Sequence, residues 1–229
     1  MIVDYARIGG RVPPPDNEGL QVADDGSFRM WRSIAPAVGR FAGKLSPGEL
    51  SQLKKEAQMA VAAGDVSRPP TMDGSAEKFQ LDGASATMGN NEDVEGAWGD
   101  LIRHVRTLLE QLVSMPQAAV GLEVGDDGRS ARLVHLGNKP ITVDLSKLSV
   151  RAVLWGRGFQ KVGDWSTPGQ PSPGQAEAEA DDSWNVPLPF DHGLKPGKNK
   201  VLHVYVTFAL AENGQRADVR AEHTPPVPP

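Results

Sequence analysis

Both helical patterns in this chain lie in its first half, and the second half shows only strand and turn patterns. The first helix is expected to begin after Ser46, because Ser46 and Glu49 have the spacing of a capping box. Gly64 is expected to end this helix. The second helix is expected over residues 98–113, where apolar side chains recur at helical spacing. This uneven distribution predicts a region of mixed α and β structure followed by an all-β region.

Short strand patterns surround the two helices. Two Asp-Gly pairs, Asp25-Gly26 and Asp82-Gly83, are strong signals of hairpin turns, since such turns need residues that tolerate positive φ angles. Strands are expected at residues 2–7, 20–23, 28–32, 38–44, 78–81 and 84–88. The first half of the chain therefore predicts a small antiparallel sheet with two helices, and the fold class of the whole chain is α+β.

In the second half, apolar and polar side chains alternate in several short segments. The longest covers residues 201–210 and places Leu202, Val204 and Phe208 on one face. Strands are expected at residues 120–124, 129–136, 141–144, 149–155, 201–210 and 217–222. Several short strands at this spacing are typical of a β-sandwich.

The change of pattern predicts a domain boundary close to Pro116. We expect an α+β domain over residues 1–116 and a β-sandwich domain over residues 117–224. Residues 166–182 lack the apolar side chains that a packed segment needs, so we expect a mobile loop there. Residues 225–229 are rich in proline and are expected to form a tail.

Composition excludes several kinds of function. The chain has no cysteine, which excludes disulfides, thiolate catalysis and iron–sulfur clusters. The net charge of −5 lacks the basic excess of a nucleic-acid or anionic-membrane surface, so neither is expected as a partner. No signal peptide or membrane-spanning segment is evident, and a cytoplasmic location is expected.

No motif in the sequence predicts catalysis, a metal site or a cofactor. The five histidines do not have the spacing of metal ligands, and His104 is expected to be solvated because it lies off the apolar stripe of its helix. His135 and His203 are expected to be structural or surface residues of strands. Acidic pairs such as Asp24-Asp25 precede glycines in turns and do not match a calcium loop. We therefore expect no enzyme activity, with no catalytic residues and no metal or cofactor ligands.

Two regions are candidates for binding a partner. The first is the segment Pro13-Pro14-Pro15-Asp16, which prolines make stiff and which is expected to be exposed. The second is the pair Trp165 and Trp184, which bracket the expected loop. Tryptophan is enriched at binding hot spots, although tryptophans that anchor the sandwich core are the alternative.

The first half of the chain resembles the emfourin family of small bacterial inhibitors of thermolysin-like zinc metalloproteases. The resemblance covers about residues 2–113 and depends on the order of several short motifs. These are Ile2-x-x-Tyr5-x-Arg7-x-Gly9-Gly10, a strand pair around Asp25-Gly26, Leu45-Ser46-Pro47-x-Glu49-Leu50, a hairpin with Phe79, and the closing helix. The resemblance implies an inhibitory fold and a metalloprotease partner, but it assigns no contact residue in this chain. The proline insertion at residues 13–16 departs from the family pattern.

The second half looks like a generic bacterial immunoglobulin-like sandwich. The resemblance is carried by the strand and turn at residues 133–140 and by Leu194-Lys195-Pro196-Gly197-Lys198. Domains of this kind mostly bind or space other domains, and the fold does not determine the function.

The sequence therefore predicts a non-catalytic protein-binding module, with a thermolysin-like metalloprotease as the partner class that the first resemblance implies. One alternative is a structural or adaptor subunit of a bacterial assembly that docks through the β-sandwich. An enzyme of unrecognised type would need a pocket with convergent polar groups and shifted pKa values.

Overall fold

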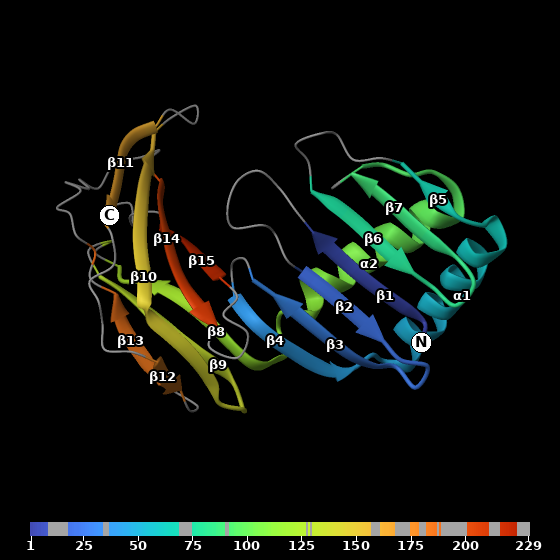
Figure 1. The fold of residues 1–229 in the computed structure, drawn as a ribbon, viewed down its shortest axis with the longest axis horizontal. Coiled ribbons are helices and arrows are strands. Elements are labelled where there is room, and N and C mark those ends of the chain that lie inside the picture. The colour runs from blue at the N-terminus through green and yellow to red at the C-terminus, as the bar shows by residue number, and fades with distance from the viewer. Residues whose placement is uncertain are drawn as a thin grey trace, which may run out of the picture. The chain divides into compact units, whose positions relative to one another are not determined.

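The computed structural model describes residues 1–8, 18–33, 37–68, 75–89, 92–126, 128, 130–156, 161–167, 175–178, 182–186, 188, 201–210 and 216–223. These residues lie mostly in β-strands and include two helices, α1 (Pro47–Ala63) and α2 (Gly96–Leu112) (Figure 1). The chain divides into two units. The first contains residues 1–32 and 39–117, and the second contains residues 33–38 and 118–229.

The first unit is a sheet with both helices on one of its faces (Figure 1). Its strands follow the order β4-β3-β2-β1-β6-β7-β5, and all neighbours are antiparallel except β5 and β7. The strands are β1 (Val3–Ile8), β2 (Glu18–Val22), β3 (Ser27–Arg32), β4 (Ala37–Lys44), β5 (Val66–Ser67), β6 (Ala76–Gln80) and β7 (Ser85–Gly89). The first two residues of β4 belong to the second unit.

The start and end of α1 agree with the sequence prediction. The backbone N–H of Glu49 donates to the hydroxyl of Ser46 at 3.3 Å, and the backbone N–H of Ser46 donates to the Glu49 carboxylate at 2.9 Å. The expected capping box is therefore confirmed. Gly64 ends the helix with a φ of +79°, a conformation that favours glycine.

The core of the first unit lies between the sheet and the helices. Alternate residues of each central strand face the helices, and α2 covers them with the apolar stripe that the sequence predicts. The largest buried side chains of this core are Tyr5, Leu20, Met30, Phe41, Phe79, Met88 and Trp98. The indole N–H of Trp98 donates to the backbone carbonyl of Gly64 at 2.7 Å, which ties α2 to the end of α1.

The second unit contains two sheets that share one apolar core. One sheet has the order β13-β9-β8, and the other has the order β11-β10-β14-β15 with β12 also paired to β10. Residues 116 and 117 of β8 belong to the first unit. The strands are β8 (Pro116–Val124), β9 (Ala131–Gly137), β10 (Ile141–Trp155), β11 (Lys161–Thr167), β12 (Gln175–Ala178), β13 (Ser183–Val186), β14 (Val201–Leu210) and β15 (Arg216–His223). Val120, Leu133, Val150 and Val204 are among the core residues, as is Val38 from the short early segment.

The alternating pattern of β14 is confirmed. Leu202, Val204, Val206 and Phe208 are buried, while the residues between them are only partly buried. The strands expected at residues 141–144 and 149–155 form one continuous strand, β10. Its pairing with β14 changes register between Asp144 and Ser149, where the sequence pattern is interrupted.

The prediction of a loop over residues 166–182 is wrong for part of that range. Residues 166–167 belong to β11, and residues 175–178 form β12, which pairs antiparallel with the start of β10. Strand pairing uses backbone groups, so a segment with few apolar side chains can add to a sheet edge. Residues 225–229, expected as a tail, lie outside the described residues.

Neither of the two described helices is both long enough and apolar enough to cross a membrane.

Candidate functional site

A row of alternating charges crosses four neighbouring strands of the first unit on the face that carries the helices. Arg7 on β1 lies opposite Glu77 on β6 and opposite Glu18 on β2, and Glu18 lies opposite Arg32 on β3. Residues directly opposite each other in antiparallel strands have Cβ atoms about 4.5–5.5 Å apart, close enough for opposite charges to stabilise each other. The charge row is therefore Glu77, Arg7, Glu18 and Arg32.

Glu18 and Arg32 form a buried ion pair. The Oε1 atom of Glu18 lies 2.6 Å from the Nε atom of Arg32, and their side chains are 5% and 9% exposed. A buried charge is costly unless an opposite charge compensates it, and here each residue compensates the other.

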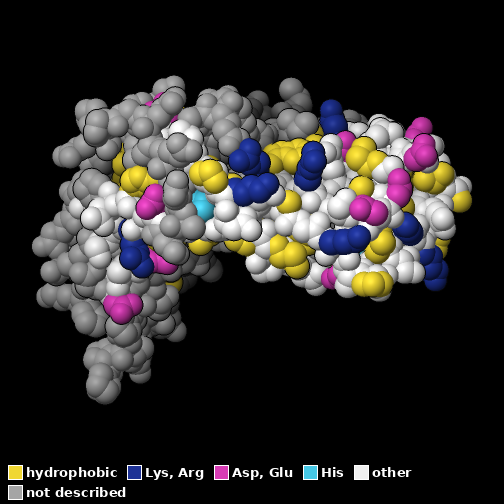
Figure 2. All heavy atoms as spheres, turned by 90° about the horizontal axis from the view of Figure 1, so that it is seen from below, with side chains coloured by type: hydrophobic (Ala, Val, Ile, Leu, Met, Phe, Trp, Pro, Cys, Tyr) yellow, Lys and Arg dark blue, Asp and Glu magenta, His cyan; other side chains and the backbone are white. Residues whose placement is uncertain are grey.

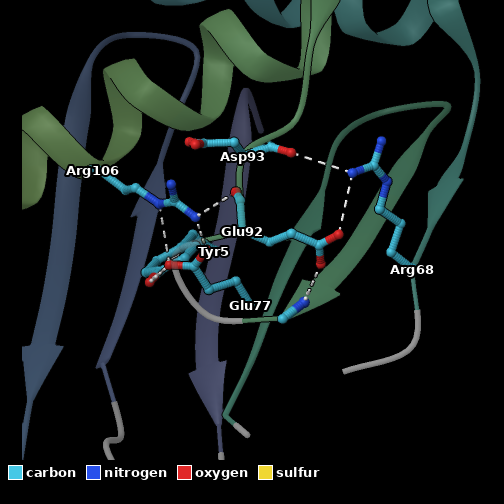
Figure 3. Close-up of polar contacts among 7 residues, drawn as sticks. Tyr5, Arg68, Glu77, Glu92, Asp93 and Arg106 are labelled. Carbon is cyan, nitrogen blue, oxygen red and sulfur yellow. Dashed lines mark hydrogen bonds and ion pairs between the residues drawn. The ribbon is translucent and has the colours of Figure 1, made fainter. Parts of the chain in front are cut away.

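Glu77 connects the row to neighbouring elements. Its side chain is 2% exposed and receives a hydrogen bond from the hydroxyl of Tyr5 at 3.2 Å. Arg106, on α2, reaches the second oxygen of Glu77 at 2.5 Å (Figure 3). Both carboxylate oxygens of Glu77 thus accept hydrogen bonds, and they join β1, β6 and α2.

The turn that precedes α2 is tied to the same network. Arg106 also donates to the backbone carbonyl of Glu92 at 3.3 Å, and the Glu92 side chain accepts a hydrogen bond from Arg68 at 3.2 Å. Arg68 donates to the backbone carbonyl of Asp93 as well (Figure 3). The network therefore extends from the sheet, through α2, to the residue that follows β5.

Burial raises the pKa of Tyr5 above its ordinary value, and the negative charges of Glu77 and Glu18 raise it further. The hydroxyl of Tyr5 stays protonated at physiological pH, so it remains a hydrogen-bond donor to Glu77.

The charge row lies at the end of the sheet where the segment containing residues 9–17 begins and ends. Arg7 and Ile8 are the last described residues before this segment, and Glu18 is the first after it. A small cavity of about 300 Å³ is lined by the row together with Tyr5, Arg106, Thr107, Leu109 and Glu110. Both ends of the segment are thus fixed to the sheet by strand pairing, and the charge row includes a residue from each end.

Of the predicted binding residues, the structure describes Trp165 and Trp184, and it places them in different sheets. Pro13, Pro14, Pro15 and Asp16 lie outside the described residues. Trp165 is in β11, opposite Ala152 of β10, whereas Trp184 is in β13, in the other sheet of the second unit. Trp184 is partly buried and packs against the sandwich core, which agrees with the anchoring alternative.

The prediction for His104 is wrong. Its side chain is 12% exposed, and its Nδ1 atom lies 2.6 Å from a carboxylate oxygen of Glu56 on α1. The residue lies off the apolar stripe of α2, but α1 packs beside that flank of the helix and covers it. The pair borders a groove of about 730 Å³ between the helices, which is also lined by Glu49, Lys55, Asp100, Arg103 and other side chains.

His135 and His203, which lie in strands, are consistent with structural roles. His135 is buried, and its Nε2 atom lies 2.8 Å from the backbone carbonyl of Lys139. His203 lies beside Tyr205, with the two ring centroids 6.2 Å apart. Within the described ranges, no group of three or more histidine, aspartate or glutamate side chains could hold a metal ion.

Surface charges of both signs occur on the described part of the first unit. Figure 2 shows lysine and arginine side chains interspersed with acidic and apolar ones on one face.

The charge row was not predicted from the sequence, although part of its signal is local. Arg7, Glu18 and Arg32 each lie two residues from a buried residue of the same strand, Tyr5, Leu20 or Met30 respectively. A charged side chain that continues the buried face of a strand is unusual and indicates a paired charge. Which charges pair depends on strand register, which connects residues far apart in the sequence.

No protein-family model matches the chain, and no curated protein matches it either.

Proposed function

We propose that this chain is a non-catalytic protein-binding module whose first unit offers residues 9–17 to a partner protein. The partner class that the emfourin resemblance implies is a thermolysin-like zinc metalloprotease. One observation carries the proposal: both ends of the segment that contains Pro13–Asp16 join a sheet whose adjacent residues form an alternating charge row, in which Glu18 and Arg32 are a buried ion pair.

Fixed ends favour binding for a physical reason. A loop that must be ordered on binding loses conformational entropy, and this loss subtracts from affinity. Proline restricts φ, so four residues that include three prolines have little backbone freedom to lose. Strand pairing of Arg7 with Glu18 limits the positions of the two ends in the same way.

We propose that the first unit is emfourin-like and that the second is an immunoglobulin-like sandwich. The sandwich would either act as a spacer for the first unit or bind a partner itself. The shared core of the two sheets supports the sandwich assignment. A cytoplasmic location, which the cysteine-free composition favours, is part of the same proposal.

The test is a titration of a thermolysin-like protease with the full chain, with residual peptidase activity as the readout. We expect activity to fall in proportion to the added chain until the two are equimolar. A variant with Pro13–Asp16 replaced by Gly-Ser-Gly-Ser should inhibit much less. A matched control, Asp24→Ser with Asp25→Asn, changes a turn at the opposite end of β2 and should inhibit like the wild type.

Full protease activity in an excess of the chain would refute the inhibitor proposal. Equal inhibition by the wild type and the Gly-Ser variant would refute the role of the proline segment.

A further inference from the structure

The sheet of the first unit has a second face, opposite α1 and α2 (Figure 1). No helix or strand among the described residues of this unit covers that face. Strand register places one row of side chains across it: Lys78 on β6, Ala6 on β1, Gly19 on β2, Trp31 on β3 and Arg40 on β4. The neighbouring row is Gln80, Asp4, Gln21, Arg29 and Ala42. We refer to these two rows as the open face.

Trp31 lies flat on the open face. A Cβ atom built on Gly19 would overlap the six-membered ring of Trp31, so the indole occupies the space directly above the backbone of β2. Glycine at position 19 is thus needed for this ring position. The side chain of Trp31 is only partly buried, so a binding partner can reach part of its surface.

Two basic side chains lie next to this tryptophan, and a third lies three strands away on the same face. Arg40 is directly opposite it, Arg29 is two residues away on the same strand, and Lys78 is in the same row; all three are exposed. The one carboxylate in the two rows is that of Asp4, which accepts a hydrogen bond from the side-chain amide of Gln21 at 3.2 Å. The open face is therefore locally basic, in contrast to the net charge of −5 of the whole chain.

Lys44 adds a basic side chain at one edge of the open face, but the carboxylate of Asp25 lies close enough to interact with it. Asp25, in the turn between β2 and β3, has a pKa lowered mainly by hydrogen bonds from Ser27, and Lys44 adds a smaller effect. The basic character is therefore strongest around Trp31, away from this turn.

We propose that the open face binds an acidic segment of a partner protein, which contacts Trp31 with an apolar side chain and Arg29 and Lys78 with carboxylates. Charge complementarity supports an acidic partner. Tryptophan and arginine are the residue types most enriched at binding hot spots. A protein fits the face better than a single-stranded nucleic acid, because nucleic-acid surfaces of this kind stack successive bases on several aromatic rings and this face has one.

The side chains of the charge row lie on the other, helix-covered face of the sheet. The inference therefore does not depend on protease inhibition, and the two proposals can fail independently.

The test uses the full chain and a fluorescein-labelled peptide of glutamate and serine with one central leucine, measured by fluorescence anisotropy. The comparison probes are a lysine counterpart of the peptide and a labelled oligodeoxythymidylate of equal length. We expect the acidic peptide to bind more tightly than either comparison probe, with an affinity that falls as salt is added.

Four variants locate the binding site. Lys78→Glu should weaken binding clearly, whereas the matched control Lys55→Glu, an equal charge change on an exposed residue of α1, should leave it nearly unchanged. Trp31→Ala should weaken binding by about tenfold or more, since removal of a hot-spot tryptophan typically costs at least that much. Gly19→Ala keeps Trp31 but displaces its ring, so it should also weaken binding.

Three results would overturn the proposal. They are no measurable binding of the acidic peptide, tighter binding of the oligodeoxythymidylate, or an equal loss of affinity in the Lys55→Glu and Lys78→Glu variants. Circular dichroism of each variant confirms that a loss of binding does not come from unfolding.

Discussion

The carboxylate of Glu18 and the guanidinium of Arg32 lie opposite each other on neighbouring strands, 2.6 Å apart and almost fully buried. Because each compensates the charge of the other, removal of one leaves the buried charge of its partner with less compensation. We expect Arg32→Met to destabilise the first unit by about 3–5 kcal/mol. Urea unfolding measures this change in free energy. The unfolding transition of the first unit should shift to a lower urea concentration, and that of the second unit should not shift.

The double variant Glu18→Leu with Arg32→Met provides the control. It removes both charges, so it should be more stable than Arg32→Met alone, and the two single changes should not add. If the double variant loses as much free energy of unfolding as Glu18→Leu and Arg32→Met lose together, the two side chains do not act as a pair.

The capping box of α1 predicts a modest loss of stability when its hydroxyl is removed. Ser46→Ala leaves the backbone N–H of Glu49 without the hydroxyl that accepts its hydrogen bond. The expected cost is about 1 kcal/mol in the free energy of unfolding. Ser46→Asp keeps an acceptor at the same position and should retain most of the stability.

The same capping box predicts a pH dependence. Hydrogen bonds from Ser46 hold the pKa of Glu49 below its ordinary value. A carboxyl group with a lowered pKa in the folded state stabilises the protein above its unfolded pKa, about 4.3, and this stabilisation is lost as the pH falls through the folded pKa. Glu49→Gln should therefore be less stable than the wild type at neutral pH, and the difference should shrink in acid.

The hydrogen bond of Trp98 predicts that the stability of the end of α1 depends on α2. Its indole donates to the carbonyl of Gly64, and its side chain is 2% exposed. Trp98→Phe removes the donor and leaves a gap, which together should cost about 1–3 kcal/mol. Hydrogen exchange should then be faster in the last turn of α1, and unchanged exchange there would contradict the coupling.

Asp164 predicts a second pH effect, in the second unit. Hydrogen bonds from Arg151 and then Lys161 hold its pKa well below the usual range. Its contribution to stability is present above the unfolded pKa of about 3.9 and is lost as the pH falls toward the lower folded pKa. Asp164→Asn should therefore be less stable than the wild type at neutral pH, and the two stabilities should converge in strong acid.

The side chain of Asp164 is partly exposed, at 29%. Salt should therefore reduce the difference between Asp164→Asn and the wild type at neutral pH. A difference that is independent of salt would indicate that the aspartate stabilises the strand in another way.

Local patterns were sufficient for the helices and for the long strand at residues 201–210. The capping box of Ser46 and Glu49 involves residues three apart, and the stripe of α2 repeats every turn. The alternation of β14 is also contained in its own sequence. Each of these signals lies within one element, so no knowledge of the neighbours was needed.

The features that were missed depend on neighbours that are distant in the sequence. His104 is covered because α1 packs beside it, and Arg7 meets Glu77 because β1 pairs with β6. The strand β12 exists because its backbone pairs with β10, although its own residues are small or polar. Register and packing therefore determine the charge row and the open face, and periodicity within one segment does not reveal them.

The segment Ser33–Val38 is made early in the chain but belongs to the second unit, where Val38 is fully buried in the core. The ribosome therefore synthesises one piece of the sandwich before most of the first unit and the rest afterwards. Domains generally fold as units during synthesis, the N-terminal one first. Here the core of the sandwich can close only after the last strands emerge. A fragment that begins at residue 118 would lack Val38, which is part of that core.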